Sequence, residues 1–197
     1  MRDPEFIIFT GPMFGSKTTR MLACVDRYRY QHKLIAVFKP KIDDRYETDK
    51  IKTHSGLSIQ AHCVESGYEI ADIITKIELA SLKRVDVIAV DEAFMIEGCS
   101  STLIQLFKTG YTIVIASIQL SATGEPFNEI KDILPWGTRV EVCPAVCSRT
   151  GEDAYYTFRK VECLDSIMIG GSDMYEARCW SSHPGLNSLE KLNDRAI

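Results

Sequence analysis

Apolar residues along the chain form two alternating patterns, short continuous runs and longer stretches with helical spacing. The continuous runs, which are typical of buried strands, cover residues 6–9, 34–38, 85–90 and 111–116. Apolar residues spaced three or four positions apart predict helices at 18–31, 70–77 and 103–110. Because strands and helices alternate and the strands are apolar throughout, we expect an α/β fold with a parallel sheet covered on both faces.

Two regions depart from this alternation. Residues 41–67 are polar and irregular, and so long a connection is either functional or disordered. After Pro135-Trp136-Gly137, short β-like runs at 138–142, 155–161 and 166–169 replace the helices. The sequence therefore predicts an α/β domain at 5–137, a small β-rich domain at 138–183 and a polar tail at 184–197.

Composition and charge exclude several classes of protein. The chain is 45% hydrophobic and 25% charged with a net charge of −4, which gives no reason to expect a nucleic-acid partner. No apolar run approaches the ~20 residues of a membrane span, and the N-terminus lacks an apolar secretory core. Seven cysteines, an odd number without a signal peptide, favour reduced thiols and a cytoplasmic location.

Residues 7–19 have the order strand, loop, helix that a phosphate-binding loop requires. The pattern G-x-x-x-x-G-K-S/T is met by Gly11, Lys17 and Thr18, but its second glycine is Ser16, with Gly15 one place earlier. In such a loop, backbone N–H groups surround phosphate oxygens, the lysine reaches the outer phosphates and the hydroxyl serves Mg²⁺. A side chain at 16 is strained if that residue needs a positive φ. The alternative is an ordinary strand-to-helix turn.

Other polar residues follow the predicted strands, at Lys39-Pro40, Asp91-Glu92 and Ser117-Ile118-Gln119. The carboxyl ends of parallel strands meet at one edge of the sheet, where α/β proteins place their ligand sites. There, Asp91 can hold Mg²⁺ and Glu92 can take a proton from an attacking hydroxyl. The alternative for this pair is a solvated strand end.

An ordered set of short motifs resembles the thymidine kinases of the cellular, poxviral and bacterial type over residues 6–183. The motifs are Gly11-Pro12-Met13-Phe14, Lys39-Pro40, Asp43, Arg45-Tyr46, His54-Ser55-Gly56, Asp91-Glu92-Ala93, Pro126-Phe127, Ile169-Gly170-Gly171 and Tyr175. The resemblance implies a RecA-like domain joined to a small zinc-held domain whose lasso loop closes over the nucleoside. It also implies transfer of the ATP γ-phosphate to the thymidine 5′-hydroxyl with Mg²⁺, and a homotetramer.

The resemblance assigns roles to individual residues. Catalysis falls to Lys17, Arg45 and the base Glu92, while Thr18 and Asp91 serve Mg²⁺. The nucleotide contacts are Gly11, Pro12, Met13, Phe14, Gly15, Ser16, Lys17, Thr18, Thr19 and Asp91. The nucleoside contacts are Met13, Phe94, Met95, Ile118, Ala122, Phe127, Thr157, Gly170, Gly171 and Tyr175.

The chain departs from the family pattern at the base pocket and at the zinc ligands. Ala122 stands where the family has a phenylalanine that stacks on thymine, and Phe94-Met95 replaces Gln-Phe. The zinc pairs, Cys143 with Cys147 and Cys179 with His183, are each one residue wider than in the family, although sulfur and imidazole suit Zn²⁺. The alternative is a decayed site of free thiols, with Cys147 at the first family cysteine and Thr150 at the second.

Three functions remain open from the sequence. The leading hypothesis is a thymidine kinase in nucleotide salvage. The second is a catalytically weakened nucleotide-binding protein of the same fold, which Ser16, Ala122 and the altered zinc pairs motivate. The third is a phosphate-loop ATPase that does not act on nucleosides.

Overall fold

A parallel six-stranded sheet forms the centre of the computed structural model, which describes residues 3–42, 49–53, 56–161 and 170–186. The strand order is β5 (His62–Val64), β2 (Ile35–Pro40), β6 (Val87–Asp91), β7 (Thr112–Ser117), β1 (Phe6–Thr10) and β8 (Arg139–Val142). Every neighbouring pair is parallel. The α/β fold and all four predicted buried strands are confirmed.

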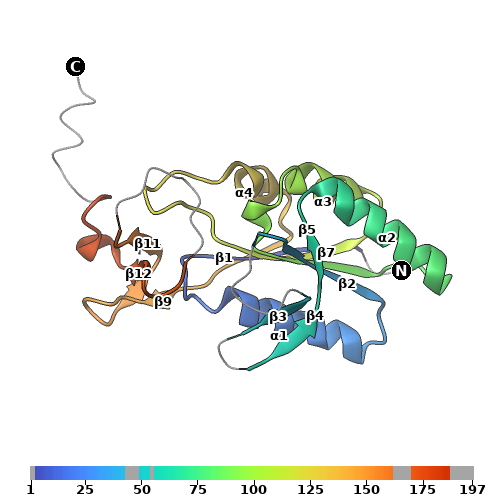
Figure 1. Cartoon of the computed structure of the whole chain (residues 1–197), viewed down its shortest axis with the longest axis horizontal. Helices are drawn as coiled ribbons and strands as arrows, with labels where there is room; N and C mark the ends of the chain where they lie inside the picture. The colour runs from blue at the N-terminus through green and yellow to red at the C-terminus, as the bar shows by residue number, and fades with distance from the viewer. Residues whose placement is uncertain (1–2, 43–48, 54–55, 162–169, 187–197) are drawn as a thin grey trace, which may run out of the picture.

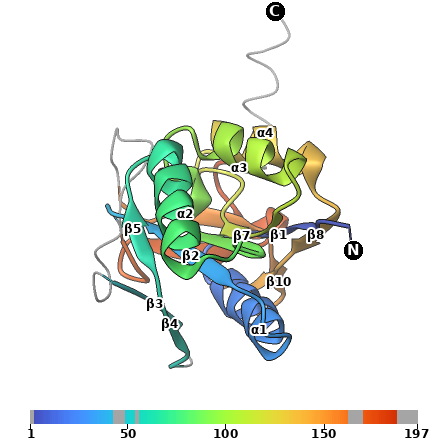
Figure 2. The same cartoon turned by 90° about the vertical axis from the view of Figure 1, so that its right-hand side faces the viewer.

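The helices cover both faces of this sheet, as Figures 1 and 2 show. Helix α1 (Lys17–Tyr30) lies on one face, and the helices of the other are α2 (Gly67–Ser81), α3 (Cys99–Lys108) and α4 (Asn128–Ile133). The three predicted helices are α1, α2 and α3. The start of α2 is fixed by Ser66, whose side chain accepts a hydrogen bond from the Glu69 N–H.

Two apolar clusters hold the helices to the sheet. One joins alternate residues of the strands, such as Ile88 and Ile113, to Ile70 of α2 and Leu103 of α3. The other joins the opposite strand residues to Met21 and Val25 of α1. Since successive strand side chains point to opposite faces, continuously apolar strands fill both clusters at once. This rigid frame fixes the positions of the strand ends.

Residues 41–67 contain short strands that the apolar pattern did not reveal. Strands β3 (Lys50–Lys52) and β4 (Ser58–Gln60) form an antiparallel hairpin beside α1, and β5 extends the main sheet. Each has three residues, and Ile51 of β3 is buried between exposed or half-buried lysines. A single apolar residue per strand is too little for a periodic signal.

The small β region lies at one end of the sheet (Figure 1). It contains β9 (Ala145–Val146) paired with β10 (Asp153–Ala154), and β11 (Tyr156–Arg159) paired with β12 (Tyr175–Arg178), both antiparallel. Strand β8, within the range predicted for the small domain, pairs with β1 of the main sheet. The predicted run at 166–169 lies outside the described residues.

Short 3-10 helices complete the fold at Ala93–Met95 (η1), Leu134–Trp136 (η2) and Trp180–Ser182 (η3). In the described part of the chain, no helix has the length and apolar content that crossing a membrane requires.

Candidate active site

The loop between β1 and α1 owes its shape to two glycines and one strained serine. A Cβ on Gly11 or on Gly15 would lie only 2.4 Å from the Cys143 carbonyl oxygen, so both positions need glycine. Ser16 has φ +57°, in the left-handed region that favours glycine. The strain expected at position 16 is therefore present, and the close approach of Cys143 explains the glycine at 15.

The phosphate-loop lysine and threonine are placed as a phosphate site requires. The Lys17 side chain is buried and its Nζ donates a 2.6 Å hydrogen bond to the Pro12 carbonyl within the loop. The Thr18 Oγ1 lies 3.0 and 3.2 Å from the two carboxylate oxygens of Asp91. A hydroxyl and a carboxylate side by side are hard oxygen donors of the kind that Mg²⁺ prefers, so the two predicted ligands fit this ion.

Glu92 occupies the sharp turn that follows β6. Its φ is +48°, a conformation that costs a residue with a side chain about 1–2 kcal/mol. The next turn, η1, is anchored to β7 because the Phe94 N–H donates to the Ser117 hydroxyl at 3.2 Å. A strained residue held in place by its neighbours is often functional. Glu92 also lines the cavity described next.

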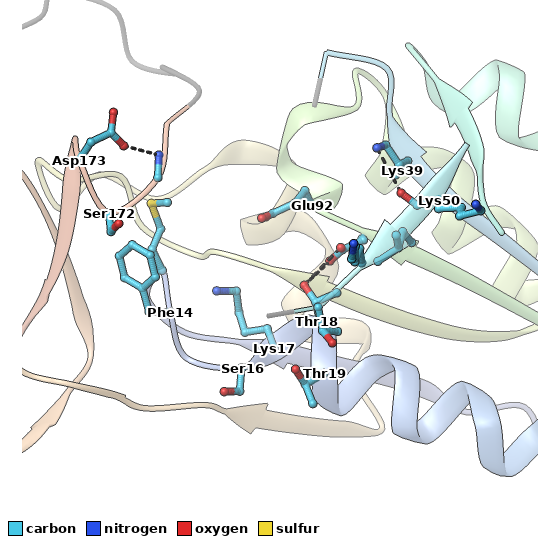
Figure 3. A pocket seen from close by; sticks show the side chains of 16 residues that line it. Phe14, Ser16, Lys17, Thr18, Thr19, Lys39, Lys50, Glu92, Ser172 and Asp173 are labelled. Carbon is cyan, nitrogen blue, oxygen red and sulfur yellow. Dashed lines mark hydrogen bonds between the residues drawn. The ribbon is translucent and has the colours of Figure 1, made fainter. Parts of the chain in front are cut away.

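These groups line one cavity of about 740 Å³. Figure 3 shows the Lys17 ammonium and the Glu92 carboxylate pointing into the same space, across from Phe14 and Ser172. The lining residues are Met13, Phe14, Ser16, Lys17, Thr18, Thr19, Lys39, Lys50, Ile51, Lys52, Thr53, Asp91, Glu92, Gly171, Ser172 and Asp173. Four lysines in one cavity suit a polyphosphate ligand.

Several lining residues were missed by sequence reasoning. Lys39 was noted as a strand end without a role, and its Nζ donates to the Lys50 carbonyl at 3.4 Å, so it also supports the hairpin. Residues 50–53 lie in the stretch read as irregular, so no signal identified them. Ser172 and Asp173 follow the Gly170-Gly171 pair directly, and this adjacency was a usable signal.

The residues expected to contact the nucleoside are distributed over four places. Met13 and Gly171 line the cavity. Phe94 and Phe127 pack together with ring centroids 4.5 Å apart, next to Met95 and Ile118 at the sheet. Thr157 and Tyr175 are buried in the β11–β12 hairpin, and Gly170 precedes β12. Ala122 lies in a turn closed by a Ser121–Glu125 hydrogen bond. The structure therefore brings together only part of this set around the described cavity.

Some motif residues lie outside the described part of the chain. These are Asp43, Arg45, Tyr46, His54, Ser55 and Ile169. The catalytic role expected for Arg45 stays a prediction.

The four residues predicted to bind zinc are separated. Cys143 packs in the cluster beneath α1, whereas Cys147 and Cys179 belong to a small alanine-rich cluster of the β region. Both ring nitrogens of His183 are engaged, Nε2 with the Thr157 carbonyl at 3.2 Å and Nδ1 with the Gly185 N–H at 3.3 Å. Among the described residues, no three His, Cys, Asp or Glu side chains form a group that could hold a metal.

Cys147 and Cys179 instead meet two hydroxyls. Their sulfurs lie 3.1 and 3.2 Å from the Ser182 Oγ, and Thr150 Oγ1 lies 3.5 Å from the Cys179 sulfur. Burial raises the pKa of Cys147, but hydrogen bonds from Ser182 and Thr150 outweigh it and lower the pKa to about 5. Two sulfurs with two hydroxyls are not a structural zinc set of four Cys or His ligands, so these residues do not fit the ion.

Comparison with known proteins identifies the family. A family model described as thymidine kinase matches residues 5–183, which include the main sheet and the small β region. The thymidine kinase of Pyrobaculum aerophilum is 31% identical over 179 residues, covering 88% of this chain and 95% of the relative. With the parallel sheet and the phosphate loop at its carboxyl edge, these matches show that the chain belongs to the thymidine kinase family.

Proposed function

We propose that the protein transfers the γ-phosphate of ATP to the 5′-hydroxyl of thymidine or a related pyrimidine deoxynucleoside. The observation that carries this proposal is the convergence of Lys17, the Thr18–Asp91 pair and Glu92 on one cavity that Gly171 also lines. Phosphoryl transfer needs charge compensation and positioning more than covalent catalysis, and this cavity offers both.

The phosphate loop and the lysines around the cavity bind the triphosphate. The backbone of the loop turns around the phosphate oxygens at the start of α1, where the helix adds partial positive charge. The Lys17 ammonium, now on the Pro12 carbonyl, is within the same cavity and compensates the charge of the outer phosphates. Thr18 and Asp91 would hold Mg²⁺, which supplies further charge compensation when bound.

Glu92 serves as the general base. Its carboxylate accepts the proton of the nucleoside 5′-hydroxyl as that oxygen attacks the γ-phosphorus, and the bond to the β–γ bridging oxygen breaks. The left-handed turn at Glu92 supports this role, since it directs the carboxylate toward the phosphate loop rather than along β6. Arg45 is assigned to the transferring phosphate by the resemblance alone.

The product would be a nucleoside monophosphate supplied by salvage for DNA synthesis. The alternatives are a weakened nucleotide-binding protein and an ATPase without a nucleoside substrate. One experiment separates the three: ADP release from ATP and Mg²⁺ across a panel of nucleosides. We expect release that depends on a pyrimidine deoxynucleoside. Release without any nucleoside would indicate the ATPase, and ATP binding without release would indicate the weakened protein.

The remaining expectations from the resemblance are separate proposals. They are a homotetramer, which light scattering on the purified chain tests, and a cytoplasmic location, which imaging in the source cell tests.

A further inference from the structure

One hydrogen bond joins the phosphate loop to the small β region. The Met13 N–H, inside the loop, donates to the Thr157 Oγ1 of β11 at 3.0 Å, across 144 residues of sequence. The Thr157 side chain is buried, with 6% of the residue exposed. Met13 itself is half-buried, so loss of the bond would leave its backbone donor without this acceptor in a partly buried place.

The strand that carries Thr157 also supports the segment across the cavity. Thr157 is paired with Ala177 of β12, and β12 starts at Tyr175, two residues after Asp173, the last of the lining residues Gly171 to Asp173. The Tyr175 N–H donates to the Gly171 carbonyl at 3.0 Å. The hairpin thus contacts the phosphate loop through its Thr157 hydroxyl and holds the opposite wall of the cavity through β12.

His183 holds the backbone carbonyl of Thr157, the residue whose hydroxyl accepts from Met13. Its Nε2 donates to the Thr157 carbonyl at 3.2 Å, and its Nδ1 accepts from the Gly185 N–H, an arrangement that selects one neutral tautomer. The ring lies edge-on to Phe158, with centroids 5.6 Å apart. Only 1% of His183 is exposed. The backbone at Thr157 is therefore held in a rigid setting, so its hydroxyl keeps its position.

We propose that Thr157 is a positioning residue that couples the two substrate sites: a nucleotide in the phosphate loop and a nucleoside at the Gly171 wall of the cavity each raise the affinity for the other. This role rests on the proposed function and differs from direct contact with the nucleoside. Both ligands bias the same rigid element, the hairpin, and any such coupling is reciprocal by thermodynamic necessity. The Met13 N–H bond links the phosphate loop directly to this element.

The first test measures affinities. Calorimetry with a non-hydrolysable ATP analogue, in the presence and absence of thymidine, gives the coupling as a ratio of dissociation constants. Thr157→Val keeps the shape but removes the acceptor, and we expect the ratio to fall about three- to tenfold, as the loss of one hydrogen bond implies. Thr157→Ser should retain it.

The matched control is Thr138→Val. The Thr138 hydroxyl also accepts a backbone N–H of the first strand, from Phe6 at 2.9 Å, but at the end remote from the phosphate loop. This variant should change thermal stability and leave the coupling ratio at the wild-type value. An unchanged ratio in Thr157→Val, or an equal loss in Thr138→Val, would overturn the proposal.

A second measurement does not depend on activity or on any variant folding. In the protein without ligands, hydrogen exchange at the Met13 amide should be as slow as at the amides of β1. Exchange at the rate of an exposed loop amide would refute the connection, whether or not the chain phosphorylates thymidine. Failure to bind the ATP analogue, with a slow Met13 amide, would instead count against the proposed function.

Discussion

The phosphate-loop edge of the sheet and the cysteine pair of the small β region differ in how far their side chains match those expected from the family pattern. At the edge, Lys17, Thr18 and Asp91 are brought together by a rigid parallel sheet. In the small region, Cys147 and Cys179 meet the hydroxyls of Ser182 and Thr150 rather than two more sulfur or imidazole ligands.

This difference suggests that the side chains of the sheet edge are harder to replace than the groups that hold the small β region together. Charge compensation at the sheet edge depends on a few side chains that have no substitute, since only a cation and hard oxygens serve phosphate and Mg²⁺. Holding a small β region together has several physical solutions. Here, an alanine-rich cluster packs near an Arg178 side chain that pairs with Glu176 and donates to the Ser182 carbonyl at 2.8 Å.

The largest expected effect tests whether the sheet edge is catalytic at all. Glu92→Gln keeps the size of the side chain but removes the base, so transfer should fall by about 100-fold or more while nucleotide affinity is retained. Steady-state rates and calorimetry measure the two quantities. Glu97→Gln, an exposed acid five residues later, is the control and should behave as wild type. Near-normal turnover in Glu92→Gln would end the assignment.

Removing the phosphate-loop cation should weaken nucleotide binding. We expect Lys17→Ala to raise the ATP dissociation constant about 10- to 100-fold, as the loss of a charge-assisted hydrogen bond implies. Lys76→Ala removes a lysine of the same type from the exposed ion pair with Asp72 on α2 and should leave the constant unchanged. If both variants bind ATP normally, the cavity is not the nucleotide site.

The base pocket is tested by restoring an aromatic ring. Ala122→Phe should tighten thymidine binding by about tenfold, since stacking of a base on a ring contributes about 1–3 kcal/mol. Ala122→Leu adds bulk without a π face and should give no such gain. Fluorescence or calorimetric titration with thymidine distinguishes them. Equal effects of both variants would place the base elsewhere, for example beside the Phe94–Phe127 pair.

The strain at Ser16 predicts a smaller effect. Ser16→Gly relieves a left-handed φ worth about 1–2 kcal/mol but increases the freedom of the unfolded chain, which offsets about 0.4–1 kcal/mol. We expect a net gain of about 1 kcal/mol or less in the free energy of unfolding, measured by urea titration. Ser16→Ala, which keeps a Cβ, should show no gain. A destabilised Ser16→Gly would mean that the serine hydroxyl makes a contribution larger than the strain.

The last prediction is that removal of metal ions has no effect on the stability of the protein. Because the cysteine pair does not offer a zinc set, chelation with EDTA should leave the thermal midpoint unchanged, and elemental analysis should find far less than one zinc per chain. A structural zinc contributes about 10 kcal/mol or more in small domains, so its removal could not be overlooked. About one zinc per chain, with a lower midpoint after chelation, would remove the contrast between the two regions.

The main sheet could be predicted because each strand is apolar on both faces and is bounded by turns. Residues 6–9 and 85–90 needed no tertiary information for this reason. Lys17, Thr18 and Asp91 could be predicted as neighbours because strand order and the loop motif together place them at one edge. Strand β3 could not, since its pairing with β4 leaves only Ile51 buried.

The separation of the zinc candidates shows a different limit. Spacing in the sequence suggested that Cys143 pairs with Cys147, but Cys143 follows β8, whose position is fixed by pairing with β1. The three residues between them leave the main sheet and enter the small β region. The spacing of two nearby cysteines cannot reveal that one of them is held at the main sheet, because the pairing of β8 with β1 spans more than a hundred residues.

The contact of the Cys143 carbonyl with Gly11 and Gly15 has a consequence for the order in which the protein acquires its shape during synthesis. Strand β1 lies between β7 and β8, so its partners are made more than a hundred residues later. The surface against which the two glycines pack exists only once residue 143 has been added. A nascent chain that ends at α4 contains all residues of the phosphate loop. It still lacks the Cys143 backbone against which Gly11 and Gly15 pack. Such late, non-local closure is intrinsically slow. The shape of this loop is therefore among the last features that the growing chain gains.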